Sequence, residues 1–432
     1  MQKKTFYLYS LGCAKNTVDS NVMAQILIRS GFQFEINPKK AQFLIVNTCG
    51  FIKPARDEAV ESLNELDGIR KRGQFLLAVG CMAEKFSDEI RERCPGVDGI
   101  LGTRSLRNIL ALIGSLDRCL MLKKTPGDIP EAAVAPQGPS AYLKIADGCS
   151  RNCAFCAIPL IKGKWQSRSV AEICRDAQEI EKAGTREIIL IAQDSTAYGR
   201  DRGENDALPG LIEKISAAAP AVSWIRILYA FPGIVSDRLI DLMAENERLL
   251  PYLDIPLQHA DPQILKAMNR PDDVEWVRRT VEKLRRRVPG IAIRSTFITG
   301  FPGETDASFN TLLDFIEEMQ FDRVGVFPYY QEAGTPSAAL PDNVPADVKQ
   351  ARADQLMSIQ QKISRKINRA FVGKTIDVLI EGQERGMYVG RSYRDAPEID
   401  GFVFAEGVAE IGDIVPVRVH SALDYDLSGK IV

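Results

Sequence analysis

The chain has 432 residues, enough for two to four domains that each bury a core. Apolar residues make up 45% of it and charged residues 26%, as in ordinary globular proteins, and the net charge of −2 gives no overall sign of nucleic-acid binding. There is no run of about 20 apolar residues and no signal-peptide pattern, so we expect a cytoplasmic protein without a membrane partner. Cysteines in that compartment stay reduced and serve metal binding or catalysis more often than disulfides.

Residues 1–124 alternate short apolar runs with helical patterns, which predicts a parallel α/β domain. The predicted strands cover 6–10, 43–47 and 75–80, and the predicted helices lie near 17–30, 54–67 and 84–93. A cysteine directly follows each strand: Cys13, Cys49 and Cys81. Because loops after parallel strands meet at one edge of a sheet, we expect these cysteines to hold a [4Fe–4S] cluster with one iron free of protein ligands. Ordinary buried cysteines are the alternative.

Residues 125–139 are rich in Pro, Gly and Ala and are predicted to be a linker. Residues 140–367 then repeat strand and helix signals six times, which predicts a partial (β/α)6 barrel with its active face at the C-terminal ends of the strands. The predicted strands cover 142–146, 186–192, 223–230, 252–257, 291–298 and 323–327. Helices are predicted at 169–182, 236–246, 261–268, 272–288 and 306–318.

The most informative motif is a C-x3-C-x2-C run after the first strand of this barrel, formed by Cys149, Cys153 and Cys156. Three thiolates at this spacing bind three irons of a [4Fe–4S] cube and leave the fourth for S-adenosylmethionine. A structural zinc or inert core thiols are the alternatives. Zinc sites usually have four ligands, and His259 and His420 are the only histidines of the chain that could help.

Four residues are candidates for binding S-adenosylmethionine. Gln193 and Asp194 follow the second barrel strand, where they are predicted to meet the amino or ribose groups; ordinary loop polarity is the alternative. Gly300 and Glu304 lie in TFITGFPGE after another strand, where glycine lets the backbone approach an adenine closely. A plain tight turn also accounts for that segment.

Residues 368–432 form short alternating strands split by Gly and Asp, which predicts a small antiparallel β-barrel of the OB-like type. Residues 371–432 contain six Lys or Arg and eleven Asp or Glu, a net charge of −5. Such a module repels phosphates and attracts a basic protein partner. Tyr393, Asp395 and Glu398, in the loop 391–401, are predicted to face that partner, with a solvated polar loop as the alternative.

The two cysteine groups and the order of the three domains resemble the radical S-adenosylmethionine methylthiotransferase family over essentially the whole chain. The matching segments are SLGCAKNTVDS, VNTCGFI, LIAQDSTAYG, YLDIPLQH, TFITGFPGET, DRVGVFPYYQEAGT and RSYRDAPEIDG. They are most similar to the branch that modifies an aspartate of small-subunit ribosomal protein S-twelve.

The resemblance implies a TRAM-type C-terminal barrel, two [4Fe–4S] clusters, S-adenosylmethionine, a sulfur donor and a low-potential electron donor. It implies insertion of SCH3 at the β-carbon of the aspartate in a basic ribosomal protein. A tRNA adenosine methylthiotransferase is the alternative, although the acidic module makes tRNA an unfavoured partner. A non-catalytic iron–sulfur carrier is a further alternative, as is a radical enzyme whose N-terminal cysteines are only structural.

Overall fold

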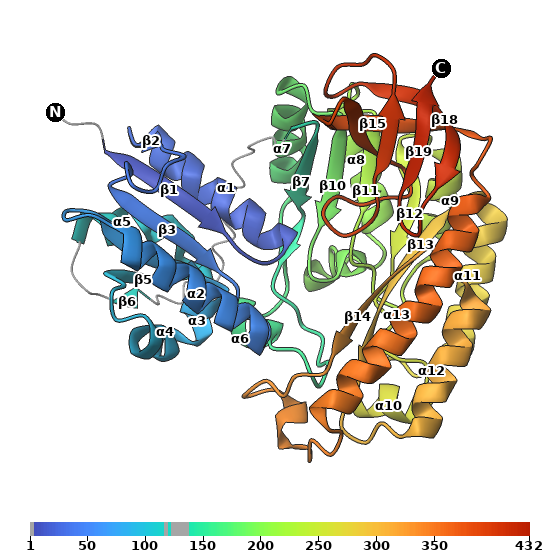
Figure 1. Ribbon diagram of the computed structural model, residues 1–432, viewed down its shortest axis with the longest axis horizontal. Coiled ribbons are helices and arrows are strands. Elements are labelled where there is room, and N and C mark those ends of the chain that lie inside the picture. Colours follow the sequence, from blue (N-terminus) through green and yellow to red (C-terminus); the bar gives the residue numbers. More distant parts are fainter. Residues whose placement is uncertain (1–3, 116–119, 122–137) are drawn as a thin grey trace.

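The chain folds into three packed units in a computed structural model that describes residues 4–115, 120–121 and 138–432 (Figure 1). Apart from residues 138 and 139, the expected linker at 125–139 lies outside these ranges. None of the helices in the described ranges combines the length and the apolar character that a membrane crossing needs.

The N-terminal unit is a six-stranded parallel sheet in the order β2-β1-β3-β4-β5-β6. Its strands are β1 (Thr5–Ser10), β2 (Gln33–Phe34), β3 (Phe43–Thr48), β4 (Phe75–Gly80), β5 (Gly99–Gly102) and β6 (Leu120–Met121). Its helices are α1 (Ala14–Arg29), α2 (Lys53–Ile69), α3 (Cys81–Lys85), α4 (Ser87–Arg93) and α5 (Ile109–Ser115), with a 3-10 turn η1 (Thr103–Asn108). The three predicted strands are confirmed, and the helix predicted over 84–93 is divided at Phe86.

The central unit is an open sheet of six parallel strands in the order β14-β13-β12-β11-β10-β7, which confirms the partial barrel. Its strands are β7 (Ser140–Lys144), β10 (Glu187–Ile191), β11 (Trp224–Ile227), β12 (Leu249–Asp254), β13 (Ala292–Thr299) and β14 (Arg323–Pro328). The helices are α6 (Ile158–Lys162), α7 (Val170–Lys182), α8 (Leu208–Ala218), α9 (Asp237–Glu245), α10 (Pro262–Ala267), α11 (Val274–Arg287) and α12 (Asp306–Met319). Short strands β8 (Ala146–Asp147) and β9 (Gln166–Ser167) pair beside the C-x3-C-x2-C loop, and 3-10 turns η2 (Ser195–Ala197), η3 (Arg200–Arg202) and η4 (Pro336–Ala339) complete the unit.

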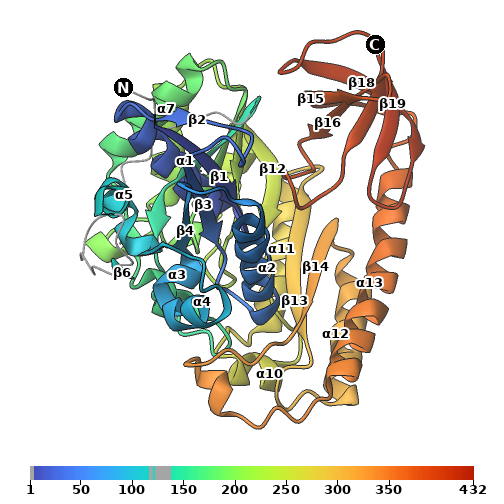
Figure 2. The same cartoon turned by 60° about the vertical axis from the view of Figure 1, so that its left-hand side comes forward.

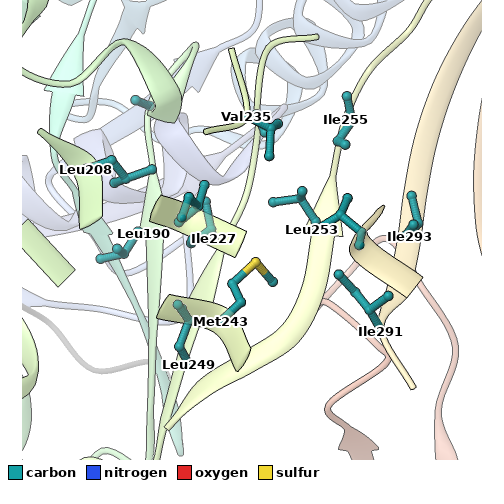
Figure 3. Close-up of a cluster of buried hydrophobic side chains, with 14 of the residues drawn as sticks. Leu190, Leu208, Ile227, Val235, Met243, Leu249, Leu253, Ile255, Ile291 and Ile293 are labelled. Atoms are coloured by element: carbon teal, nitrogen blue, oxygen red, sulfur yellow. The ribbon is translucent and has the colours of Figure 1, made fainter. Parts of the chain in front are cut away.

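The apolar strands of this unit are buried on both faces. Leu190, Ile227 and Leu253 point toward the surrounding helices and form the main core (Figure 3). Alternate residues such as Ile189 and Tyr252 point the opposite way, where they pack against α1 and the C-terminal unit. This double coverage explains why the strands read as continuous apolar runs instead of alternating ones.

The C-terminal unit is a closed five-stranded barrel in the order β15-β16-β17-β19-β18. Its strands are β15 (Thr375–Glu384), β16 (Met387–Ser392), β17 (Val403–Glu406), β18 (Ile414–Ala422) and β19 (Leu427–Ile431). All pairs are antiparallel, as expected, except β17 and β19. These two run parallel because β18 separates them along the chain and reverses its direction.

Helix α13 (Ala346–Arg369) runs along the central unit up to the barrel (Figure 2). Buried polar residues on it hold both units in place. Gln360 Nε2 donates to Phe321 O at 2.8 Å, and Asn368 Nδ2 donates to Leu423 O at 3.3 Å. Because buried amides must be hydrogen-bonded, these contacts fix the barrel relative to the sheet.

Candidate functional site

The parallel topology brings the three N-terminal cysteines to one edge of their sheet. Cys13 precedes α1, Cys49 follows β3, and Cys81 is the first residue of α3. A Cβ on Gly12 would lie 2.9 Å from Cys49 Cβ, and a Cβ on Gly50 would lie 2.9 Å from the Cys81 carbonyl carbon. The three loops therefore touch, and only glycine permits the approach at these two positions.

Cys49 and Cys81 are buried, whereas Cys13 is exposed. Burial raises the pKa of Cys49 to about 11, and the charge of Cys13 adds to that effect. Burial also holds the pKa of Cys81 well above its ordinary value, and Cys49 and Cys13 contribute in the same direction. A cationic iron cluster would supply the positive charge that stabilises such thiolates, so this triad fits a cluster.

The second triad lies between β8 and α6 at the C-terminal edge of the central sheet. The Arg151 amide donates to Cys149 Sγ at 3.4 Å, and Arg270 Nη1 donates to Cys153 Sγ at 3.6 Å. Burial raises the pKa of Cys156 to about 12, and the charges of Cys153 and Cys149 raise it further. Donors directed at cysteine sulfur are a common means of tuning iron–sulfur clusters, so this triad also fits a cluster.

Within the described residues, no three His, Cys, Asp or Glu side chains converge as closely as a single bound ion requires. A structural zinc needs four donors within about 2.3 Å of one atom. A [4Fe–4S] cube makes no such demand, because its cysteine ligands bind different irons.

The two triads adjoin across the interface of the first two units. Cys81 packs with Ala157, the residue after Cys156, and with Ile161. Helices α3 and α6 lie side by side there (Figure 1). Arg104 reinforces the contact by donating from Nε to Ile161 O at 2.7 Å.

A buried ion network crosses the same interface. Asp19 on α1 accepts from Lys162 Nζ at 2.6 Å and also pairs with Lys144 on β7. Asp147 lies 3.3 Å from Lys144 and 3.6 Å from Lys162. Although burial acts to raise the pKa of Asp147, the two lysines hold it far below its ordinary value. The sequence analysis did not predict this network. The one feature of the sequence that indicates it is a lysine in the otherwise apolar strand YLKIA.

Gln193 and Asp194 lie at the C-terminal end of β10, beside the second triad. Gln193 Nε2 donates to Asp147 Oδ1 at 3.0 Å, while its buried Oε1 has no partner among the described residues. Asp194 is buried and pairs with Arg151 at 2.9 Å. A buried acceptor without a donor suits a ligand that brings one.

Gly300 and Glu304 form the turn after β13. Gly300 has a φ of +72°, and its amide donates to Glu304 Oε1 at 2.9 Å. The Glu304 carboxylate also pairs with Arg352 at 2.8 Å and with His259 at 3.3 Å. Glu304 therefore fixes the backbone of this turn, and its role toward a cofactor stays a prediction.

The loop 391–401 occupies a position that differs from the expected one. It inserts at the N-terminal end of the central strands, where Arg391 pairs with Glu187 at 2.6 Å and Arg323 pairs with Asp395 at 2.5 Å. These ion pairs lie at the end of the central sheet opposite to the cysteine triads, and the loop covers that end. The loop binds the central unit because its charged side chains find buried partners there.

The expectation that Asp395 faces a protein partner is therefore wrong, whereas that for the half-buried Tyr393 stays a prediction. Asp395 is only 1% exposed, and the Tyr393 hydroxyl donates to Gly290 O at 3.0 Å. Glu398 alone of the three remains exposed.

Comparisons with known proteins agree with this architecture. Residues 143–316 match the radical SAM superfamily, residues 5–102 match the uncharacterized protein family UPF0004, and residues 372–432 match the TRAM domain. The chain is 45% identical to ribosomal protein uS12 methylthiotransferase RimO of Roseiflexus sp. (strain RS-1), over 99% of this chain and 97% of that protein. It is 43% identical to the protein of the same name from Herpetosiphon aurantiacus, over 99% of this chain and 100% of that one.

A solved structure shares the fold at low identity. It is the radical S-adenosylmethionine methyltransferase TsrM from Kitasatospora setae, with a TM-score of 0.57 and 12% identity over 84% of this chain and 89% of that one.

Proposed function

The chain belongs to the family of radical S-adenosylmethionine methylthiotransferases that act on ribosomal protein uS12, and we propose that its six triad cysteines hold two [4Fe–4S] clusters for this reaction. Members of the radical S-adenosylmethionine superfamily use one such cluster and S-adenosylmethionine. Cys149, Cys153 and Cys156 hold that cluster in this proposal. The remaining three cysteines, at the edge of the N-terminal sheet, hold the second.

The observation that carries the proposal is the direct packing of Cys81 against Ala157. It places one triad beside the other, although they lie in different units. A sulfur carried at the first triad is then near the place where the substrate is activated. The buried ion network around Asp19 holds the two units in this arrangement.

When bound, the clusters and S-adenosylmethionine supply the radical and sulfur chemistry needed at an unactivated carbon, here the β-carbon of an aspartate. The protein itself binds and orients these groups. Gln193 Oε1 offers an acceptor to the cofactor, and Asp194 holds Arg151 beside Cys149. The turn at Gly300, fixed by Glu304, presents backbone to the cofactor.

The C-terminal barrel serves the protein substrate in this proposal. Its net charge of −5 over residues 371–432 suits a basic ribosomal protein and disfavours tRNA. Arg391, Arg394 and Asp395 are buried against the central unit, so two of the six positive charges and one of the eleven negative charges are withdrawn from the surface of the barrel. A sulfur donor and a low-potential electron donor complete the reaction, which we place in the cytoplasm.

Iron content tests the assignment of the clusters. Anaerobically reconstituted wild-type protein should bind about eight irons per chain, as two four-iron clusters require. Cys13→Ala, Cys49→Ala and Cys81→Ala should each bind about four and still cleave S-adenosylmethionine reductively. Cys174→Ala, on α7 away from both triads, is the control and should match the wild type. Iron that stays near the wild-type value in the first three variants would refute the second cluster.

Product analysis tests the substrate. The reconstituted enzyme is incubated with S-adenosylmethionine, a sulfide source, a reductant and either uS12 or tRNA. We expect uS12 to gain one SCH2 unit on an aspartate and the tRNA to remain unchanged. Modification of the tRNA alone would contradict the proposal.

A further inference from the structure

Lys15 lies where the loops of the two cysteine triads meet. It is in the first turn of α1, two residues after Cys13. Its Nζ lies 3.2 Å from the ring centroid of Tyr229, which follows β11 at the C-terminal edge of the central sheet. The side chain thus reaches from the N-terminal unit onto the face where the second triad lies.

The Lys15 ammonium has no anionic partner of its own. Among the described residues it forms neither a hydrogen bond nor an ion pair, whereas nearby Lys144 and Lys162 both pair with Asp19. Lys15 is half-buried, and a cation withdrawn from water without a partner is costly. Contact with an aromatic face recovers part of that cost and leaves the N–H donors free for an anion.

The two carboxylates near Lys15, Asp254 and Asp147, already have other cations as partners. The charged groups that interact electrostatically with Lys15 are Cys13, Asp254, Asp147 and Lys162. Asp254 is bound by Arg294 at 3.2 Å, and Asp147 is bound by two lysines. Lys15 is therefore not the direct ion-pair partner of either carboxylate, and its ammonium stays available to the carboxylate of a substrate.

Tyr229, whose ring contacts Lys15, has a strained backbone conformation. Tyr229 has a φ of +64°, in the left-handed region that aromatic residues rarely adopt. Its carbonyl accepts from the Ser195 amide at 2.8 Å, and its own amide donates to Asp254 Oδ2 at 3.3 Å. Strain that neighbouring hydrogen bonds maintain is typical of functional sites, and here it places an aromatic face under an unpaired cation.

We propose that the Lys15 ammonium binds the side-chain carboxylate of the substrate aspartate. This inference rests on the proposed function and names the residue that selects its substrate. In aspartate the β-carbon is bonded directly to the carboxylate carbon, so holding the carboxylate fixes the reacting carbon within one bond. A neutral nucleobase offers this cation only uncharged ring-nitrogen acceptors, so Lys15 favours an acidic side chain over an adenosine.

The test is a double-mutant cycle on the reconstituted holoenzyme with S-adenosylmethionine. Binding is measured for a uS12 peptide that contains the aspartate and for the same peptide with Asn in its place. Wild type should bind the Asn peptide about 10- to 100-fold more weakly, the range expected for a charge-assisted hydrogen bond. Lys15→Met should lose the same factor for the Asp peptide and show little preference between the two. Lys39→Met removes an exposed lysine of the same unit and should behave as wild type.

Two results would overturn the inference. One is Lys15→Met retaining the wild-type preference for Asp over Asn. The other is a Lys15→Met variant in which the reduction potential or the electron paramagnetic resonance spectrum of the N-terminal cluster shifts while peptide binding does not change. Lys15 would then only balance the charge of the cluster. Failure of the proposed function is seen separately, as wild-type enzyme that leaves uS12 unmodified.

Discussion

Lys162 Nζ lies 2.6 Å from Asp19 Oδ2, and this contact joins the segment after Cys156 to the helix after Cys13. Asp19 also pairs with Lys144, so one carboxylate of the N-terminal unit binds two lysines of the central unit. All three side chains are at most 4% exposed. The arrangement of the two triads therefore depends on charges that only the folded protein brings together.

Asp19→Asn should destabilise the protein by about 3–5 kcal/mol, because it removes one of the two carboxylates that neutralise two buried lysines. Chemical denaturation of the wild type and the variant measures the difference. Asp57→Asn is the matched control, since Asp57 pairs with Lys53 and Arg93 on the surface. Such exposed pairs contribute less than about 1 kcal/mol. Equal losses in the two variants would contradict the assignment of Asp19.

Glu187→Gln should weaken the contact between the C-terminal barrel and the central unit. The Glu187 carboxylate is fully buried between Arg226 and Arg391, and its loss leaves both partly unpaired, at a cost of about 3–5 kcal/mol. Glu213→Gln, at an exposed pair with Arg238, is the control and should change stability little. Limited proteolysis should release the barrel from Glu187→Gln and not from the control.

The Glu187 carboxylate should also make the stability of the protein depend on pH. Burial acts to raise its pKa, but Arg391 and Arg226 lower it from 4.5 to about 2 in the folded state. A depressed pKa stabilises the folded state above the unfolded value, and this contribution is lost as the pH falls from about 4.5 toward 2. The wild type should lose about 3 kcal/mol more than Glu187→Gln over that interval. Parallel stability curves for the two proteins would contradict the prediction.

A comparison of Gly300→Ala with Gly303→Ala distinguishes the cost of backbone strain from the cost of a steric clash. Both glycines have positive φ, +72° and +89°, where an alanine costs about 1–2 kcal/mol. A Cβ at Gly300 would also lie 2.1 Å from Lys349 Cγ, whereas one at Gly303 meets nothing within 4 Å. Gly300→Ala should therefore lose more stability, and it should weaken S-adenosylmethionine binding by moving the turn held by Glu304. Equal stability losses would show that Lys349 moves aside freely.

Gln193→Leu should weaken S-adenosylmethionine binding about tenfold, the upper range for one neutral hydrogen bond. The reason is that Gln193 Oε1 is buried and unpartnered within the described part of the chain. Calorimetric titration of the reconstituted protein measures the affinity, and iron content should not change. Gln383→Leu replaces an exposed glutamine of β15 and is the control. Unchanged affinity in Gln193→Leu would remove this residue from the cofactor site.

The sequence alone determined the features that depend on nearby residues. The C-x3-C-x2-C spacing, the cysteine after each N-terminal strand and the apolar runs of the sheets are local patterns, and the strands they predict are present. Parallel strands also place their following loops at one edge, so the meeting of Cys13, Cys49 and Cys81 follows from chain order.

The way in which the three units meet depends on contacts between residues far apart in the chain. Asp19 is separated from Lys162 by 143 residues, and Arg391 from Glu187 by 204. Nothing in the local sequence distinguishes these residues from surface charges, because an ion pair becomes structural only when packing removes it from water. For the same reason the loop 391–401 reads as a solvent-facing segment, although its Asp395 is buried. Lys15 likewise differs from other lysines only in what the fold places around it: an aromatic ring and carboxylates with which other cations already pair.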